Sequence, residues 1–522
     1  MATNKQKRPS TAFGENGLKK TIGAVIEEIK SIYLADEIPW VIGYSGGKDS
    51  TAVLQLVWLA LSDLEPEKRT KPIYVITTDT LVENPVVSAW VKRSLETMKI
   101  TAETHGLPII PNMLTPEVVD TFWVNLIGKG YPAPRPKFRW CTERLKIKPA
   151  NAFITRVVRE NGEAILVLGS RKAESSVRAA NMEKYESQRT RERLSAASLL
   201  PNAFVYTPIE NWSNDDVWLF LMQIPNPWGY NNKDLLTMYQ GASPDGECPL
   251  VVDTTTPSCG DSRFGCWVCT LVDQDRSMHA MIQNDEEKEW MLPLLELRND
   301  LDLKDDRHLR DFRRLSGAVQ LLNGRTVHGP YMQEVRGNWL RRVLEAQQWV
   351  RENGPPHVRD IELISLAELH EIRRIWVVEK HELEDSLPRI YRAVTGQIFP
   401  GQRIDDNLIL GADEMTLLRD ACDNDQLHFE LTRELLDVER RYRTFTRRAG
   451  LYDALEQSVR RSFYLDEDDA TDRAIRYRDA LAATHTGDIQ AIQVFRAESQ
   501  EQAPLYQITS LVRASQNRKD NL

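Results

Sequence analysis

One short stretch near the N-terminus constrains the fold more than any other part of this 522-residue chain. An apolar run over 40–44 predicts a buried strand, and the helical pattern that starts at Ala52 predicts a helix soon after it. The loop between them carries Gly46 and Gly47, which permit positive φ and let the backbone approach a ligand closely. Because the free amides of a helix N-terminus bind phosphate, we expect a phosphate-binding loop here.

The loop differs from the Walker A pattern, which separates two glycines by four residues and then places Lys directly before Ser or Thr. Its sequence, Ser-Gly-Gly-Lys-Asp-Ser-Thr, resembles the loop of the PP-loop ATP pyrophosphatases and of the phosphoadenosine phosphosulfate (PAPS) reductase-like proteins. Those proteins release pyrophosphate from ATP while transferring AMP, or bind an adenylylated substrate. The resemblance implies that ATP is bound by Ser45, Gly46, Gly47, Lys48, Asp49, Ser50 and Thr51.

Further apolar runs alternate with helical patterns and predict an α/β fold built on a doubly wound parallel sheet. We expect helices over 17–35 and 84–105, and further strands over 72–80, 107–110 and 164–169. Ser213 is expected to cap a later helix whose first turn carries Asp215 and Asp216. In such sheets ligands bind at the carboxyl ends of the strands, which is where we place the active site.

Two of the predicted strands end in polar side chains that suit this edge of the sheet. Asp79 could accept a hydrogen bond from adenosine or hold Mg²⁺ through water, or it could simply cap a helix. Arg171 offers a planar fork for phosphate, and Glu174 could orient it. Residues 169–175 resemble the Gly-x-Arg-x-x-Glu-Ser stretch of the PAPS reductase-like proteins. The catalytic candidates are therefore Lys48, Asp49 and Arg171.

The cysteines indicate a second site. The chain has six, and with no export signal they favour metal or redox chemistry over a disulfide framework. Four fall within 248–269, and Cys141 lies in a segment, 139–149, that resembles the cysteine-bearing element of the family's iron–sulfur branch. Four thiolates suit a 4Fe-4S cluster or a tetrahedral zinc ion, and one close pair with a remote cysteine is nearer to iron–sulfur. The expected ligands are Cys141, Cys259, Cys266 and Cys269, with Cys248 as a spare ligand or sulfur carrier.

Composition divides the chain and limits its surroundings. We expect a disordered arm over 1–12, a nucleotide-binding domain over 13–240, a cysteine-rich loop over 241–275 and a helical region over 276–522 that binds DNA or a partner. The formal net charge is −9, so any nucleic-acid surface must be local. No run approaches the ~20 apolar residues that span a membrane. Without a secretory signal, we expect a cytoplasmic protein that does not contact membranes.

The helical region contains one basic stretch with aromatic residues interleaved, over 440–448, followed by Arg460 and Arg461. Such a stretch can contact a phosphate backbone. Flanking acidic residues make a solvated ion-pair face an equal alternative. Helical patterns are expected over 287–314, 331–353, 363–395 and 414–455, with a loop at the acidic residues 466–469.

The chain as a whole resembles the sulfurtransferase-like component of bacterial DNA phosphorothioation, a DNA modification linked to restriction–modification. The resemblance is carried by the glycine-rich loop, the arginine element, the cysteines and the helical half. The resemblance implies that ATP with Mg²⁺ is split to AMP and pyrophosphate to activate a DNA backbone phosphate. Sulfur from a cysteine desulfurase would then replace an oxygen, and other subunits of the system would be partners. The alternatives are a PAPS- or APS-type reductase, a tRNA thiolase and a non-catalytic assembly subunit. Such a reductase would need a C-terminal Glu-Cys-Gly-type nucleophile, whereas the last cysteine here is Cys422, and a scaffold would not need this loop.

Overall fold

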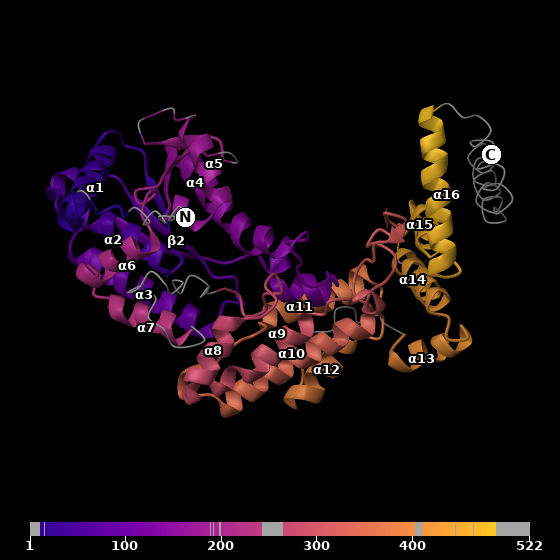
Figure 1. The fold of residues 1–522 in the computed structure, drawn as a ribbon. Helices are drawn as coiled ribbons and strands as arrows, with labels where there is room; N and C mark the ends of the chain where they lie inside the picture. Colours follow the sequence, from indigo (N-terminus) through magenta and orange to yellow (C-terminus); the bar gives the residue numbers. More distant parts are fainter. Residues whose placement is uncertain are drawn as a thin grey trace, which may run out of the picture.

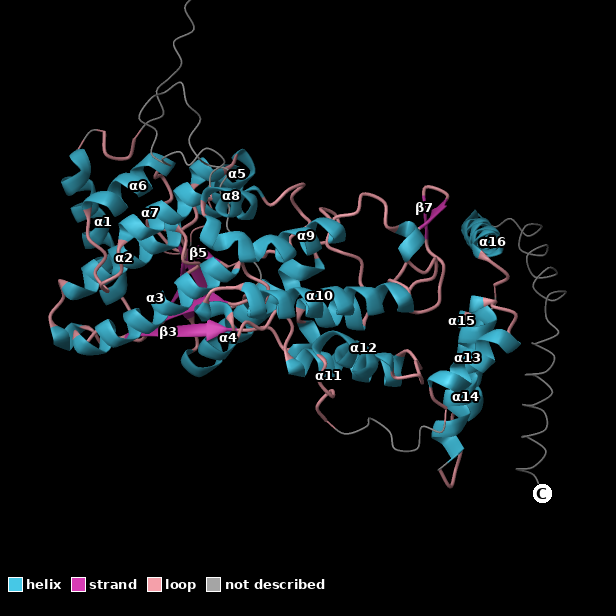
Figure 2. Cartoon of the chain, turned by 90° about the horizontal axis from the view of Figure 1, so that it is seen from below, coloured by secondary structure: helices cyan, strands magenta, loops and turns pink. Residues whose placement is uncertain are grey.

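The computed structural model describes residues 11–242, 265–401 and 410–486, except for residues 15, 188, 190, 192, 198, 199, 444 and 463. Three parts follow one another along the molecule (Figure 1): an α/β part with α1 to α7, a middle part with α8 to α12, and an end part with α13 to α16. Figure 2 shows α10 running through the middle part, where it packs against α9 and α12.

The α/β part is organised around one sheet of six strands in the order β3-β2-β1-β4-β6-β5. All neighbours pair in parallel except β5 and β6, so the doubly wound parallel sheet expected from the sequence is confirmed. The chain winds outward from β1 in one direction and then from β4 in the other, and ligands bind where the winding direction changes. The strands are β1 (Trp40–Gly43), β2 (Ile73–Thr78), β3 (Ile109–Leu114), β4 (Ala164–Val167), β5 (Ser195–Ala196) and β6 (Ala203–Tyr206).

Helices cover both faces of this sheet: α1 (Gly17–Leu34), α2 (Lys48–Ser62), α3 (Pro85–Thr104), α4 (Lys148–Asn161), α5 (Ser176–Glu186), α6 (Asn214–Gln223) and α7 (Asn232–Gly241). The helices predicted over 17–35 and 84–105 are confirmed. Ser213 caps α6 as expected, because its side chain accepts a hydrogen bond from the Asp216 amide. Strand β3 begins two residues later than predicted and continues to Leu114, since it pairs with β2 along its whole length.

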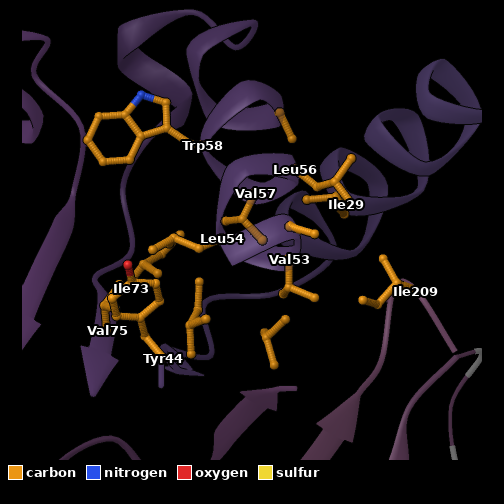
Figure 3. Packing of buried hydrophobic residues seen from close by; sticks show 14 of the residues in the cluster. Ile29, Tyr44, Val53, Leu54, Leu56, Val57, Trp58, Ile73, Val75 and Ile209 are labelled. Atoms are coloured by element: carbon orange, nitrogen blue, oxygen red, sulfur yellow. The ribbon is translucent and has the colours of Figure 1, made fainter. Parts of the chain in front are cut away.

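Alternation along the strands separates two apolar layers. Trp40 and Ile42 of β1 face the layer of α1 and α2, whereas Val41 faces that of α4. Helix α2 is apolar on almost all sides, which is the pattern of a helix buried on all sides. Figure 3 shows its side chains Val53, Leu54, Leu56, Val57 and Trp58 among Ile29 of α1, Ile73 and Val75 of β2, Tyr44 and Ile209. The glycine-rich loop over 45–51, expected to bind phosphate, therefore leads directly into a deeply buried helix.

A second core joins the α/β part to the middle helices. It contains residues 122–145, which lie between β3 and α4 and were not expected to pack against helical segments. The Trp123 indole donates to the carbonyl of Leu363 at 2.7 Å, and the Trp376 indole donates to that of Ile127 at 2.9 Å. The helices of this part are α8 (Arg276–Asn284), α9 (Leu292–Leu301), α10 (Gln333–Asn353), α11 (Leu366–Arg374) and α12 (Ser386–Thr395).

The end part consists of α13 (Ala412–Ala421), α14 (Gln426–Arg443), α15 (Leu451–Arg461) and α16 (Glu467–Thr486). Two helical-half predictions were wrong. The helix expected through 314 ends at Leu301 and is followed by irregular chain with a hairpin of β7 (Leu321–Leu322) and β8 (Arg325–Thr326). Of the acidic residues 466–469, expected in a loop, Asp466 precedes α16, whereas 467–469 form its first turn, where carboxylates are favourable. None of the helices in the described ranges is long and apolar enough to cross a membrane.

Candidate active site

A cavity of about 1060 Å³ opens at the carboxyl ends of β1, β2 and β4. Among the residues expected to bind nucleotide, it is lined by Ser45, Gly46, Gly47, Lys48, Asp49, Asp79, Arg171 and Glu174. Ser50 and Thr51 do not line it; their side chains are buried behind the loop. The loop after β1 and the carboxyl ends of β2 and β4, the strands on either side of β1, thus come together around one cavity.

The loop keeps its shape through glycine and serine. Gly46 has a φ of +72°, and a Cβ atom there would lie 2.4 Å from the side chain of Val91, so only glycine fits. The Ser45 amide donates to the Ser50 hydroxyl at 3.1 Å, and that hydroxyl donates to the Gly47 carbonyl at 3.0 Å. These bonds close the loop on itself and leave Lys48 as the first residue of α2.

Asp49 and Arg171 form the charged centre of the cavity. The Asp49 carboxylate lies 2.8 Å from Nε of Arg171 and 3.2 Å from Nζ of Lys48. The Arg171 side chain is buried, yet neither its Nε nor Oδ1 of Asp49 has a hydrogen bond of good geometry. Buried polar atoms without such bonds are costly and cluster at functional sites. The pair is therefore suited to exchange its contact for one with a phosphate.

Segments around β4 hold Arg171 in place. Its amide donates to the Glu174 carboxylate at 2.8 Å, so Glu174 orients the main chain of Arg171 and not its guanidinium group. The guanidinium group donates to the Trp212 carbonyl at 3.3 Å. A Cβ atom on Gly169 would lie 3.0 Å from the Asp49 carbonyl, so this glycine lets β4 approach the phosphate-binding loop.

Asp79 does not cap a helix, because the N-cap residue of α3 is Asn84. The Asp79 carboxylate accepts a hydrogen bond from the Leu81 amide at 2.8 Å, which stabilises the turn after β2. It also lines the cavity. Burial, reinforced by the nearby Glu83 carboxylate, raises the pKa of Asp79. A cation in the cavity would reverse that shift, which is consistent with a carboxylate that helps to hold a metal ion.

Tyr239 of α7 lines the same cavity and was missed at the sequence level. Its hydroxyl accepts a hydrogen bond from the Lys48 amide at 3.4 Å, and Nζ of Lys48 lies 5.6 Å from the ring centroid. Burial raises the pKa of the Tyr239 hydroxyl, so it stays neutral. Nothing in the sequence identifies it, because 191 positions separate it from Lys48.

The thiols lie directly beside this cavity. Cys266 pairs with Glu83 as an isolated β-bridge, and the Trp267 amide donates to the Val82 carbonyl at 2.9 Å. The Cys266 sulfur lies 3.3 Å from the Thr80 hydroxyl and 3.9 Å from the Glu83 carboxylate. Since Glu83 also lines the cavity, a single side chain joins the nucleotide site to the thiol.

The thiols and the charged groups around them also shift one another's pKa values. Burial, followed by Glu83, raises the pKa of Cys266 to about 12, and Cys269 adds to the increase. Burial and then Cys269 likewise raise the pKa of Cys141. Burial alone would lower the pKa of Lys146, but Cys266 and Glu83 outweigh it and raise that pKa. A cation fixed beside several thiols suits a centre whose thiolates carry negative charge.

The described thiols fit such a centre only in part. Cys141, Cys266 and Cys269 have the right donor chemistry, but no group of three or more His, Cys, Asp or Glu side chains in the described ranges is placed to hold a metal ion. Cys259 and Cys248 lie outside the described residues. Cys422 is buried far from this region, in a small core with Leu383, Met415 and Phe429.

The basic stretch of the helical half forms an ion-pair face. Arg440 and Arg441 of α14 both pair with Asp437, a fully buried carboxylate. Arg448 pairs with Glu439 and Arg460 with Glu456. Of the two interpretations that the sequence left equal, the structure favours the ion-pair face for these arginines.

The α/β part is similar to a known protein family. Residues 39–231, from β1 through α6, match the family model of the phosphoadenosine phosphosulfate reductase domain. This part of the chain is a PAPS reductase-like domain. The matched residues include the glycine-rich loop and Arg171, which line the cavity at the carboxyl edge of the sheet.

The chain is also similar to an uncharacterised protein of Methanocaldococcus jannaschii, with 28% identity over 200 residues. The match covers 38% of this chain and only 35% of that relative, so it spans about a third of the relative's length.

Two solved structures are similar at low identity. One is the FMN adenylyltransferase of Candida glabrata in complex with FAD and pyrophosphate, with 13% identity, a TM-score of 0.25, and coverage of 45% of this chain and 66% of that chain. The other is a tRNA thiolase of Methanococcus maripaludis with its 4Fe-4S cluster, with 15% identity, a TM-score of 0.26, and coverage of 45% of this chain and 80% of that chain.

Proposed function

We propose that this protein is an ATP-dependent sulfurtransferase of DNA phosphorothioate modification, of the DndC type. The observation that supports this most is the single side chain, Glu83, that lines the nucleotide cavity and contacts the Cys266 thiol. A nucleotide site beside reactive sulfur suits an enzyme that first activates an oxygen and then replaces it. The PAPS reductase-like domain supplies the nucleotide half of this pair.

In the first step a non-bridging oxygen of a DNA phosphodiester attacks the α-phosphorus of ATP, and pyrophosphate leaves. The oxygen, otherwise a very poor leaving group, is now esterified to AMP. Lys48 and the loop amides stabilise the charge that builds on pyrophosphate. Asp79 would help to hold Mg²⁺, which would supply further positive charge for the phosphate oxygens. Arg171 turns from Asp49 toward a phosphate, which satisfies the donor that has no good partner in the structure.

In the second step a thiolate attacks the inner sulfur of a cysteine desulfurase persulfide, which forms a disulfide between that thiol and the desulfurase cysteine and releases a hydrosulfide ion. The hydrosulfide ion then attacks the activated DNA phosphorus. AMP leaves with the former DNA oxygen, and a proton is released. Cys141, Cys266 and Cys269, with Cys259 as the fourth ligand, would hold a 4Fe-4S cluster, which with all four irons ligated would supply structural support or electron transfer beside the cavity. Lys146 and Glu83 hold their charges between that centre and the cavity.

The acceptor separates this proposal from its alternatives. The protein would be incubated without oxygen with ATP, Mg²⁺, a cysteine desulfurase, radiolabelled cysteine, partner subunits of the system, and either duplex DNA or tRNA. We expect label in DNA that resists nuclease cleavage, and none with the Lys48→Ala variant. Label in tRNA alone would identify a thiolase, and release of sulfite from added adenylyl sulfate in the presence of a thiol reductant would identify a reductase. Unchanged labelling by Lys48→Ala would exclude the loop from the reaction.

A further inference from the structure

An exposed turn precedes Cys141 and carries two cations and an aromatic ring. Arg135 and Phe138 close it with both of their main-chain hydrogen bonds, at 3.3 and 2.8 Å. Lys137, Phe138 and Arg139 are exposed at its tip, and Phe138 has 42% of its surface accessible. We call residues 135–139 the cationic turn. A phenylalanine this exposed has no role in the core that would explain it.

The base of the cationic turn is firmly anchored. The Arg135 guanidinium group pairs with the Asp302 carboxylate at 3.1 Å, at the end of α9. The Thr270 hydroxyl donates to the Pro134 carbonyl at 2.7 Å, and both groups are buried. The tip is therefore held out from the surface in a fixed position, which lowers the entropy that a partner must overcome on binding.

The same anchors attach the cationic turn to the thiols. Arg139 is two positions before Cys141, and Thr270 directly follows Cys269. On the other side of the thiols, Cys266 contacts Glu83 of the nucleotide cavity. The connections therefore run from the cationic turn through the thiols to the nucleotide cavity.

The charges of the cationic turn are available for a partner. In the described part of the chain, neither Lys137 nor Arg139 has a carboxylate within ion-pair distance. Arg440 and Arg441, the other basic candidates, both pair with the buried Asp437. Since the chain carries a formal net charge of −9, two unpaired cations at the tip of a rigid turn are a local exception that favours a polyanionic partner.

An aromatic and cationic surface continues behind the tip. The rings of Phe138 and Tyr131 lie 6.3 Å apart, and the Arg144 guanidinium group lies 5.0 Å from the centroid of the Tyr131 ring. Cations contact backbone phosphates, whereas exposed aromatic rings stack on bases. A free phosphate or polyphosphate would use the cations but would have no use for Phe138.

We propose that the cationic turn binds the DNA strand that is modified, with Lys137 and Arg139 on its backbone phosphates and Phe138 stacked on a base. This inference rests on the proposed function and gives it a substrate-binding surface. A strand held there would lie close to the thiols, because Pro134 at the base of the turn contacts Thr270, which directly follows Cys269.

The test is DNA binding to the full-length protein, measured by fluorescence anisotropy with a labelled duplex and with its single strand across a range of salt concentrations. The variants are Lys137→Ala/Arg139→Ala and Phe138→Ala. The matched control is Lys19→Ala/Lys20→Ala, which removes two exposed cations from α1, a helix of the α/β part that belongs to neither the cavity nor the thiol region.

We expect the double variant to lower affinity at least roughly tenfold and to reduce the salt slope by about 2, one per phosphate contact. Phe138→Ala should lower affinity for the single strand roughly tenfold with an unchanged salt slope. The control should bind as the wild type does. Equal binding by the wild type and both turn variants would overturn the inference and leave the proposed function standing. A clear preference for tRNA or for inorganic polyphosphate over DNA would also overturn the inference. Loss of binding in the turn variants, with no sulfur incorporation by the wild type, would instead overturn the proposed function alone.

Discussion

At the scale of single residues, the site depends on where a side chain is missing as much as on where one is present. Gly46 is required by its positive φ and by the Val91 side chain. Gly169 is required because it lets the end of β4 touch the backbone of Asp49. The first could be expected from a glycine-rich loop, but the second depends on a contact between distant segments.

Gly169→Ala should therefore impair ATP cleavage without unfolding the protein. The added methyl group would push against the Asp49 backbone at 3.0 Å and displace the Asp49–Arg171 pair, with a loss of roughly tenfold or more in the rate. Gly241→Ala, at the end of α7 with nothing within 4 Å of the new methyl group, is the matched control. A Gly169→Ala enzyme as active as the Gly241→Ala enzyme would refute the role given to this contact.

Cys266→Ser tests the thiol centre. Because Cys266 contacts Glu83, which lines the cavity, and is one of the expected cluster ligands, we expect protein purified without oxygen to lose most of its iron and acid-labile sulfide when this thiol is replaced. Cys422→Ser removes a buried thiol from a separate core and should keep the wild-type content. Colourless wild-type protein with stoichiometric zinc would instead make the centre structural.

At the scale of elements, the fold of the α/β part could be predicted from the sequence. The packing of residues 122–145 between the α/β part and the middle helices could not. Strands β1, β2 and β4 and helices α1 and α3 follow directly from apolar periodicity. Residues 122–145 gave no such signal, because Trp123 meets its partner Leu363 across 240 positions of sequence. For the same reason the cavity-lining Tyr239 could not be foreseen, whereas the loop that it contacts could.

Helix α2 packs in the core and begins at the site, so a substitution in its buried face should lower the stability of the whole α/β part. Leu54→Ala deletes a fully buried side chain of α2 (Figure 3) and should cost about 2–5 kcal/mol of unfolding free energy. Leu417→Ala makes the same change on an exposed side chain of α13 and should cost little. Urea unfolding followed by tryptophan fluorescence measures both, and equal midpoints would contradict the packing described for α2.

At the scale of the whole molecule, charged groups join the end part to the middle part, alongside the small apolar core that Leu383 forms with Met415 and Phe429. Arg313 pairs with Glu430 of α14, and His381 lies 2.6 Å from Asp437. Burial opposes ionisation of Asp437, but its hydrogen bonds to His381 and Arg440 outweigh that effect and lower its pKa to about 2. The stabilisation is present above the pKa of about 3.9 of an unfolded aspartate and is lost as the pH falls through about 2.

Lys380 at the same junction should make stability rise in alkaline solution. Burial, helped by the Arg336 charge and only partly offset by Glu382, Asp311 and Glu430, lowers its pKa from 10.5 to about 8. Between those two pH values the unfolded chain binds more protons than the folded one, so unfolding free energy increases with pH. The Lys380→Met variant should lack that increase when unfolding is measured from pH 8 to 10.5. Equal pH dependence in both proteins would show that Lys380 keeps its charge on folding.

The central claim of the proposed function is that ATP is cleaved between its α- and β-phosphates. The direct measurement is separation of the nucleotide products formed from labelled ATP with Mg²⁺ and DNA, by the wild type and by Lys48→Ala and Asp49→Ala. The account predicts AMP and pyrophosphate in equal amounts from the wild type, and neither from the two variants, whose fold stays intact. ADP with inorganic phosphate, or unchanged AMP formation by either variant, would contradict it.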